Sequence, residues 1–133
     1  MDDSPSDVYL FKTALREHCR YHEIYSVDDG DAAIEFLRHK GRHADAPNID
    51  LVVLDINMPR RTGHEVLEEV KADPELKAIP VVMLTSSTHL QDVSRAYGSH
   101  VNCYVEKPTD WQSWGEVVQA IEKFWCGLVR LPH

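Results

Sequence analysis

The stretch Leu51-Val-Val-Leu-Asp55-Ile-Asn-Met-Pro59 decides the fold of this chain. Four apolar residues precede Asp55, and Pro59 and Gly63 follow it, so the pattern predicts a buried strand that ends at a carboxylate. A continuous Val/Leu run is typical of a strand in a parallel sheet that helices cover on both faces. We therefore expect Asp55 at the carboxyl edge of the sheet, where open α/β folds bind their ligands.

Other apolar runs of the chain also end at polar residues. Residues 81–84 and 103–105 are such runs, and two acids follow Met1 directly. The polar residues placed in this way are Asp2, Asp3, Asp55, Thr85 and Lys107. If the runs are parallel neighbours, their ends bring three carboxylates, a hydroxyl and an amine to one edge.

Composition narrows the class of protein. A chain of 133 residues with 43% hydrophobic residues is the size of one soluble domain. The net charge of −8 argues against nucleic-acid binding, which needs a basic surface. No apolar run is long enough for a membrane span and no secretion signal opens the sequence, so we expect a cytoplasmic protein. The three cysteines and eight histidines lack zinc-site spacing, so we expect reduced thiols and no histidine metal site.

Helical patterns alternate with the predicted strands. Ser4-Pro5 starts a first helix, and a short strand at 23–27 precedes a helix that begins near Gly30 and ends at Gly41. Capping boxes at 62–65, 88–91 and 109–112 predict the starts of three more helices. Strands alternating with helices imply right-handed βαβ units and a parallel sheet.

The residues at the strand ends carry a resemblance. Asp2-Asp3, Leu54-Asp55-Ile-Asn-Met-Pro59 with Gly63, Leu84-Thr85-Ser86 and Tyr104-Val-Glu-Lys107-Pro108 occur in this order. Over essentially the whole chain, 1–133, the sequence resembles a response-regulator receiver domain of two-component signalling. The resemblance implies a flavodoxin-like, doubly wound parallel sheet of strand order 2-1-3-4-5 with helices on both faces.

The same resemblance implies roles for individual residues. Asp55 would accept a phosphoryl group from a sensor histidine kinase, Thr85 would sense it, and Lys107 would pair with it. Tyr104 would be the aromatic switch residue, and the Lys107–Pro108 peptide bond would be cis. The implied Mg²⁺ ligands are Asp2, Asp3, Asp55 and the backbone carbonyl of Asn57. Simpler roles remain open for these side chains: helix capping, a turn, solvation or packing.

The amino terminus departs from the family pattern. Receivers begin with an apolar strand that runs into the acidic pair, whereas here Met1 alone precedes Asp2. We expect the first strand to be missing or truncated before Asp2, either because the record starts late or because the sheet forms without it. In the second case, metal binding by Asp2 and Asp3 would be the first function affected.

The carboxyl-terminal part suggests partners. An apolar stripe on the last helix continues into an apolar tail, so residues 110–132 are expected to form a homodimer or partner surface. The tail also resembles the single-domain regulators of phytochrome-type kinases. Two alternatives to a non-enzymatic phosphoacceptor remain: a receiver-like binding module that is never phosphorylated, and an aspartyl phosphohydrolase. The hydrolase is disfavoured because Asn57 stands where that class has a second acid.

Overall fold

The computed structural model describes residues 1–2, 4–18, 24–39 and 49–128. Helices and strands alternate along the chain after two initial helices. The elements are α1 (Pro5–His18), α2 (Gly30–Leu37), β1 (Val52–Leu54), α3 (Gly63–Ala72), β2 (Val81–Thr85), α4 (Leu90–Gly98), β3 (Cys103–Glu106), α5 (Trp111–Glu122) and the π-helical turn η2 (Lys123–Leu128). None of the helices in these ranges is long and apolar enough to cross a membrane.

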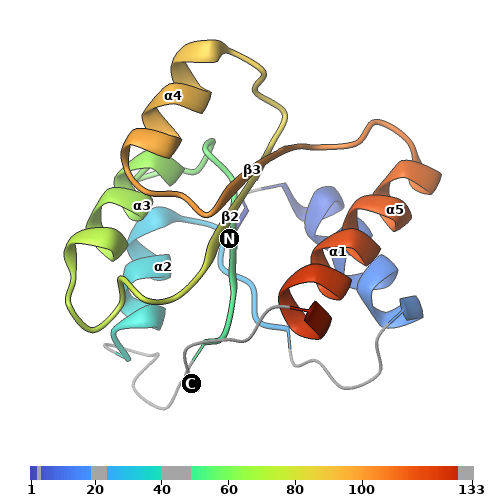
Figure 1. The fold of residues 1–133 in the computed structure, drawn as a ribbon, viewed down its shortest axis with the longest axis horizontal. Helices are drawn as coiled ribbons and strands as arrows, with labels where there is room; N and C mark the ends of the chain where they lie inside the picture. Colours follow the sequence, from blue (N-terminus) through green and yellow to red (C-terminus); the bar gives the residue numbers. More distant parts are fainter. Residues whose placement is uncertain (3, 19–23, 40–48, 129–133) are drawn as a thin grey trace.

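The three strands form one parallel sheet in the order β1-β2-β3. Val52 lies opposite Val81 in the first pair, and Val82 lies opposite Cys103 in the second. Helices α1 and α5 lie together on one side of the sheet, and α2, α3 and α4 lie on the other (Figure 1). This arrangement confirms the predicted doubly wound α/β fold, since parallel strands need helical crossovers on their faces.

The core is divided by the sheet into two apolar clusters. The larger one packs α2 and α3 against β1 and β2, and it includes Leu67, Val70 and Met83, which are at most 1% exposed. The smaller one joins α1 and α5 through Ala14, Trp114 and Val118, which contact Leu84 of β2. Because β2 is buried along its whole length, the sheet edge at Thr85 is held from both sides.

Met1 and Asp2 occupy the position of one short strand beside β1. The Met1 ammonium donates to the Val53 carbonyl at 2.8 Å, and the Asp55 amide donates to the Met1 carbonyl at 2.9 Å. On the other side, the Asp2 amide donates to the Val27 carbonyl at 3.0 Å. The carboxyl end of the expected first strand is therefore in place between its two predicted neighbours.

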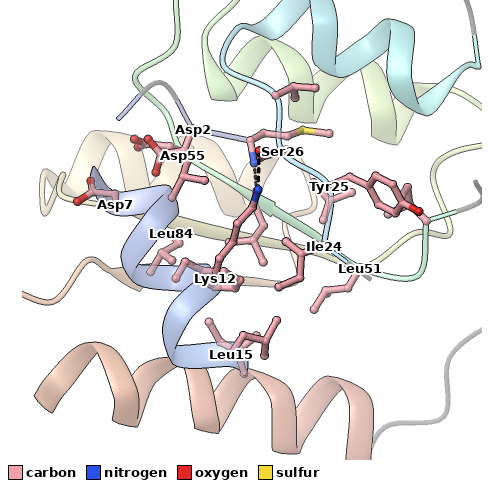
Figure 2. Close-up of a pocket in the computed structure, with 18 of the residues that line it drawn as sticks. Asp2, Asp7, Lys12, Leu15, Ile24, Tyr25, Ser26, Leu51, Asp55 and Leu84 are labelled. Carbon is pink, nitrogen blue, oxygen red and sulfur yellow. Dashed lines mark hydrogen bonds between the residues drawn. The ribbon is translucent and has the colours of Figure 1, made fainter. Parts of the chain in front are cut away.

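A cavity of about 610 Å³ continues from Met1 along the line of this short strand. Apolar side chains from α1, α5, β1 and residues 24–27 line most of it, and Asp2, Asp7 and Asp55 gather at one end (Figure 2). Lys12 reaches into the cavity from α1 and donates to the Ser26 hydroxyl at 3.1 Å. The volume lies where the expected first strand would continue.

Several sequence expectations need correction. Residues 24–27 form no strand, because only two residues of the described chain stand beside them to pair; Glu23 lies outside the described residues. The helix expected to run to Gly41 ends at Leu37, with Arg38 as its C-cap. Gly41 itself lies outside the described residues. The first capping box, Thr62 with Glu65, is present. The second is not, because the N-cap of α4 is His89 without a side-chain cap bond. The third is replaced by Asp110, a stronger acceptor than Thr109, which bonds the Ser113 amide.

The Lys107–Pro108 bond was expected to be cis and is not. The described part of the chain contains no cis peptide bond. The backbone instead leaves β3 with the Lys107 amide donating to the Thr85 carbonyl at 2.7 Å. This bond continues the β2–β3 pairing by one residue and directs the Lys107 side chain without a cis turn.

Candidate functional site

The turn after β1 presents Asp55 at the carboxyl edge of the sheet. Asp55 is 4% exposed, and its Oδ1 accepts a hydrogen bond from the Asn57 amide at 3.4 Å. Gly63 packs directly beneath this turn, where its amide donates to the Ile56 carbonyl at 2.7 Å. A Cβ atom on Gly63 would lie 2.1 Å from the Asp55 carbonyl oxygen, so the close approach requires glycine.

Lys107 stands at the centre of an acidic cluster. Its Nζ atom lies 2.8 Å from Asp55 Oδ2, 2.8 Å from Asp2 Oδ2 and 2.7 Å from Asp7 Oδ2. The sequence predicted Asp2, Asp55 and Lys107 to converge because each follows an apolar run or its expected equivalent. We call Asp2, Asp7, Asp55 and Lys107 the acidic cluster.

Asp7 was not predicted as a site residue. It lies in the first turn of α1, where an acid is explained by the helix dipole alone. The available signal was its position, because α1 begins directly after the acidic pair and its first turn must therefore face the same edge. Asp7 is therefore a carboxylate of the cluster that the sequence pattern did not include.

The electrostatics of the cluster favour a charged lysine. Burial by itself lowers the pKa of Lys107, but the hydrogen bonds to Asp2, Asp55 and Asp7 outweigh burial and raise it. The Lys107 side chain is only 7% exposed, so the ammonium neutralises part of the cluster in a site with little solvent screening. The arrangement is a buried group of three carboxylates whose charge is offset in part by one ammonium.

Thr85 and Tyr104 lie on the neighbouring strands. Thr85 is fully buried, and its Oγ1 accepts the Ser87 amide at 3.4 Å. Tyr104 of β3 is half-buried and donates its hydroxyl proton to the Ser87 carbonyl at 2.8 Å. Both residues proposed as switch elements therefore meet at the backbone of Ser87 in the loop between β2 and α4.

The carboxylates suit a hard cation. Because Asp2 Oδ2 and Asp55 Oδ2 both lie 2.8 Å from one nitrogen, they lie within twice that distance of each other. Oxygen atoms so arranged match the ligands that Mg²⁺ prefers. Asp3 lies outside the described residues, and Asn57 is exposed at the rim. Within the described ranges, no group of three or more His, Cys, Asp or Glu residues forms a ready metal site.

Comparison with known proteins is consistent with this geometry. A family model, the response regulator receiver domain, matches residues 1–121. Response regulator Rcp1 of Synechocystis sp. is 41% identical over 132 residues, which cover 99% of this chain and 90% of the relative.

Two solved structures are also similar. The phosphorylated cyanobacterial phytochrome response regulator RcpA superposes with a TM-score of 0.96 at 40% identity, over 100% of this chain and 95% of that one. The Mn²⁺-bound form of Rcp1 gives a TM-score of 0.94 at 41% identity, over 100% and 96%. With its parallel sheet and the acidic edge after β1, the chain belongs to the response regulator receiver domain family.

Proposed function

We propose that this protein is a phosphoacceptor response regulator that takes a phosphoryl group from a sensor histidine kinase onto Asp55. The observation that supports this best is the acidic cluster, in which the Lys107 ammonium contacts the Asp55 carboxylate at 2.8 Å in a buried site. A carboxylate that is held beside a fixed cation can attack an anionic phosphoryl donor, because the cation offsets the charge repulsion.

The proposed phosphoryl transfer is a nucleophilic displacement at phosphorus. A carboxylate oxygen of Asp55 forms a bond to phosphorus, the bond from phosphorus to the donor imidazole nitrogen breaks, and the electron pair returns to the imidazole. Lys107 then serves as a positioned charge for a phosphoryl oxygen. The product is an acyl phosphate on Asp55, which adds negative charge and three hydrogen-bond acceptors.

Mg²⁺ is the proposed cofactor. Asp2, Asp3, Asp55 and the carbonyl of Asn57 would hold it, and the bound ion would supply charge neutralisation for the incoming phosphoryl group. The placement of Asp2 and Asp55 around one point supports the fit. Asp7 lies 2.7 Å from Lys107 Nζ and would keep the ammonium within the cluster if Asp2 and Asp55 held the ion.

The response is proposed to involve Thr85 and Tyr104. A phosphoryl group on Asp55 would attract the Thr85 hydroxyl, and Thr85 contacts the Ser87 amide while Tyr104 contacts the Ser87 carbonyl. A movement at Thr85 would therefore reach β3 and α4 through a single residue. We propose that the surface of α4, β3 and α5 changes its partner binding in consequence.

Finer features of this function are also proposals. The kinase is of the phytochrome type, which the likeness to Rcp1 and RcpA supports, and the protein is cytoplasmic and not itself an enzyme. Residues 110–132 form a homodimer or partner surface, supported by the exposure of Trp111 and Phe124; residues 129–133 lie outside the described ranges. Light scattering on a chain shortened after Lys123 tests dimerisation, and an unchanged mass would remove this idea.

One assay separates the phosphoacceptor from the alternatives. The protein is incubated with Mg²⁺ and acetyl phosphate, and its intact mass is followed over time. We expect a single phosphoryl adduct that is absent in Asp55→Asn and in the presence of a chelator. The absence of any adduct would support a binding module, and rapid turnover of acetyl phosphate without a stable adduct would support a phosphohydrolase.

A further inference from the structure

His64 is a buried histidine that the proposed transfer does not use. It is the second residue of α3, is 2% exposed, and places its Nε2 3.2 Å from Asp92 Oδ1. Its Nδ1 is buried and has no hydrogen-bond partner among the described residues. Asp92 is therefore the hydrogen-bond partner that orients this ring. An unpaired buried polar atom such as Nδ1 is uncommon in folded proteins and calls for an explanation.

The second oxygen of Asp92 reaches the switch loop. Ser87 Oγ donates to Asp92 Oδ2 at 2.5 Å, a length typical of a strong bond to an ionised carboxylate. The bonds from Ser87 and His64 lower the pKa of Asp92, in keeping with an ionised side chain at neutral pH. One carboxylate thus joins α3, through His64, to the loop between β2 and α4.

Ser87 is the residue on which both switch side chains converge. Its amide donates to Thr85 Oγ1 at 3.4 Å, and its carbonyl accepts the Tyr104 hydroxyl at 2.8 Å. The Asp92 carboxylate accepts a hydrogen bond from the Ser87 hydroxyl, and this hydroxyl in turn accepts one from the His89 amide at 3.4 Å. A bond that holds this hydroxyl restrains Ser87, whose amide and carbonyl are the groups that Thr85 and Tyr104 contact.

We propose that Asp92, oriented by His64, is a positioning residue for the switch: it holds Ser87 so that the loop links Thr85 to Tyr104. Through His64 and Asp92, the loop between β2 and α4 is connected to the first turn of α3. This helix begins at Gly63, which packs against the Asp55 turn. Movement of Thr85 after phosphorylation is then transmitted to α4 through the Ser87–Asp92 bond. This inference rests on the proposed phosphoacceptor function for its signalling meaning, but not for its structural meaning.

The simpler alternative is that Asp92 only stabilises α4. It lies in the first helical turn, where any acid interacts favourably with the helix dipole, and the N-cap His89 makes no side-chain cap bond. The two explanations differ in their dependence on Ser87. A dipole effect persists when the Ser87 hydroxyl is removed, whereas a positioning effect requires that hydroxyl.

The test compares hydrogen exchange in the unphosphorylated full chain. The variants are Asp92→Ala, Ser87→Ala and the double substitution, with Gln91→Ala on the exposed face of α4 as the control. We expect amides 86–88 to exchange about tenfold faster in each single variant, since a bond to a charged group is lost. The His89 amide is excluded, because it donates to Ser87 Oγ itself. The double variant should be no faster than either single one. Additive effects, or unchanged loop exchange, would overturn the proposal.

A second measurement concerns the response to phosphorylation. After treatment with Mg²⁺ and acetyl phosphate, Asp92→Ala should form the same adduct as the wild type by intact mass but lose the exchange change at 103–106. Asp92→Glu keeps a carboxylate within reach of Ser87 and should restore part of this change. His64→Phe, which keeps the buried volume, should reduce it several-fold. A full response in Asp92→Ala would refute the linkage.

The two hypotheses fail in different ways. If the wild type forms no adduct, the phosphoacceptor function fails, and the exchange comparison in the unphosphorylated chain still decides whether Asp92 holds Ser87. If the adduct forms and the coupling between Asp92 and Ser87 is absent, only the positioning role fails.

Discussion

The ammonium of Lys107 and the carboxylate of Asp55 lie 2.8 Å apart although 52 residues separate them in the chain. Both side chains are almost fully buried, at 7% and 5% exposure. Their contact brings the end of β3 to the end of β1 across β2, and it fixes the position at which phosphoryl chemistry is proposed. Several expectations about stability and response follow from this pair and its surroundings.

Replacing Lys107 should destabilise the fold strongly. Lys107→Met leaves buried carboxylates without their cation, and breaking a buried ion pair by removing one partner costs about 3–5 kcal/mol. Urea unfolding measures the loss. Asp55→Asn should retain the fold, and combining it with Lys107→Met should recover part of the stability. Lys77→Met, at an exposed position, is the matched control and should be nearly neutral. Equal effects at the two lysines would contradict the buried pair.

Replacing Gly63 by alanine should destabilise the fold, whereas the same change at Gly98 should not. Gly63→Ala places a Cβ against the Asp55 carbonyl, so the turn must shift, and we expect a loss of about 1–3 kcal/mol together with slower phosphorylation. Nothing lies within 4 Å of a Cβ at Gly98, at the end of α4. Gly98→Ala should be neutral or stabilising by up to about 1 kcal/mol. Thermal unfolding and acetyl phosphate labelling check both; a harmless Gly63→Ala would be the contrary result.

Filling the cavity beside Met1 should stabilise the protein. Five Val and Ile residues fused before Met1 can continue the short strand between residues 24–27 and β1, and they bury apolar area in a space of about 610 Å³. Burial gains exceed the ordering cost, so we expect about 2–4 kcal/mol of added stability. A fusion of five Gly and Ser residues is the control. If the two fusions melt at the same temperature, the cavity does not accept a strand.

In a chain whose first residue is Met1, the free amino group of that residue should make stability depend on pH. Burial lowers its pKa from 8.0 to about 6 in the fold. Between these values the unfolded chain carries the proton and the folded chain does not, so the free energy of unfolding rises with pH from 6 to 8. The rise amounts to about 2–3 kcal/mol at 1.36 kcal/mol per pKa unit. Chemical denaturation across this range measures it, and the fused chains, which lack this amine, should not show it.

Thr85 should transmit the phosphoryl signal without being needed to acquire the group. Thr85→Val removes the hydroxyl in a fully buried position while nearly keeping its volume, so adduct formation by acetyl phosphate should persist. The change at Tyr104 and α4 should be lost, as seen by hydrogen exchange with and without the adduct. Thr88→Val, at an exposed position of the same loop, is the control. Loss of the adduct itself in Thr85→Val would assign this residue to the transfer instead.

The sequence predicted the placement of Asp2, Asp55, Thr85 and Lys107 because strand ends coincide in a parallel sheet. Asp55, Thr85 and Lys107 follow apolar runs, and Asp2 stands where the end of a further strand was expected. Asp7 and His64 escaped prediction for a common reason. Both lie on helices, where an acid in the first turn and a histidine on the packed face have local explanations, and only the packing of helices against the sheet reveals their contacts.

Predictions from short sequence patterns were least reliable at the starts of α4 and α5 and at the strand expected over residues 23–27. Thr109 fits a capping pattern, but Asp110 one position later accepts the cap bond. Thr88 also fits one, but α4 has His89 as its N-cap, and His89 makes no side-chain cap bond. Residues 24–27 have strand-forming side chains, yet a strand needs a paired neighbour, and the Asp2 amide pairs with Val27 alone among these residues. The pattern of residues along the chain does not show which side chain caps a helix or whether a strand has a partner to pair with.

The hydrogen bond from the Asp55 amide to the Met1 carbonyl has a practical consequence for anyone preparing the protein. An affinity tag or protease scar ahead of Met1 would sit one peptide bond from the residue that anchors the proposed phosphoacceptor. Kinetic constants measured on such a chain would reflect the added residues as well as the protein itself. Chains that differ in the residues ahead of Met1 are therefore expected to differ at Asp55, and activities should be compared between chains that share the same first residue.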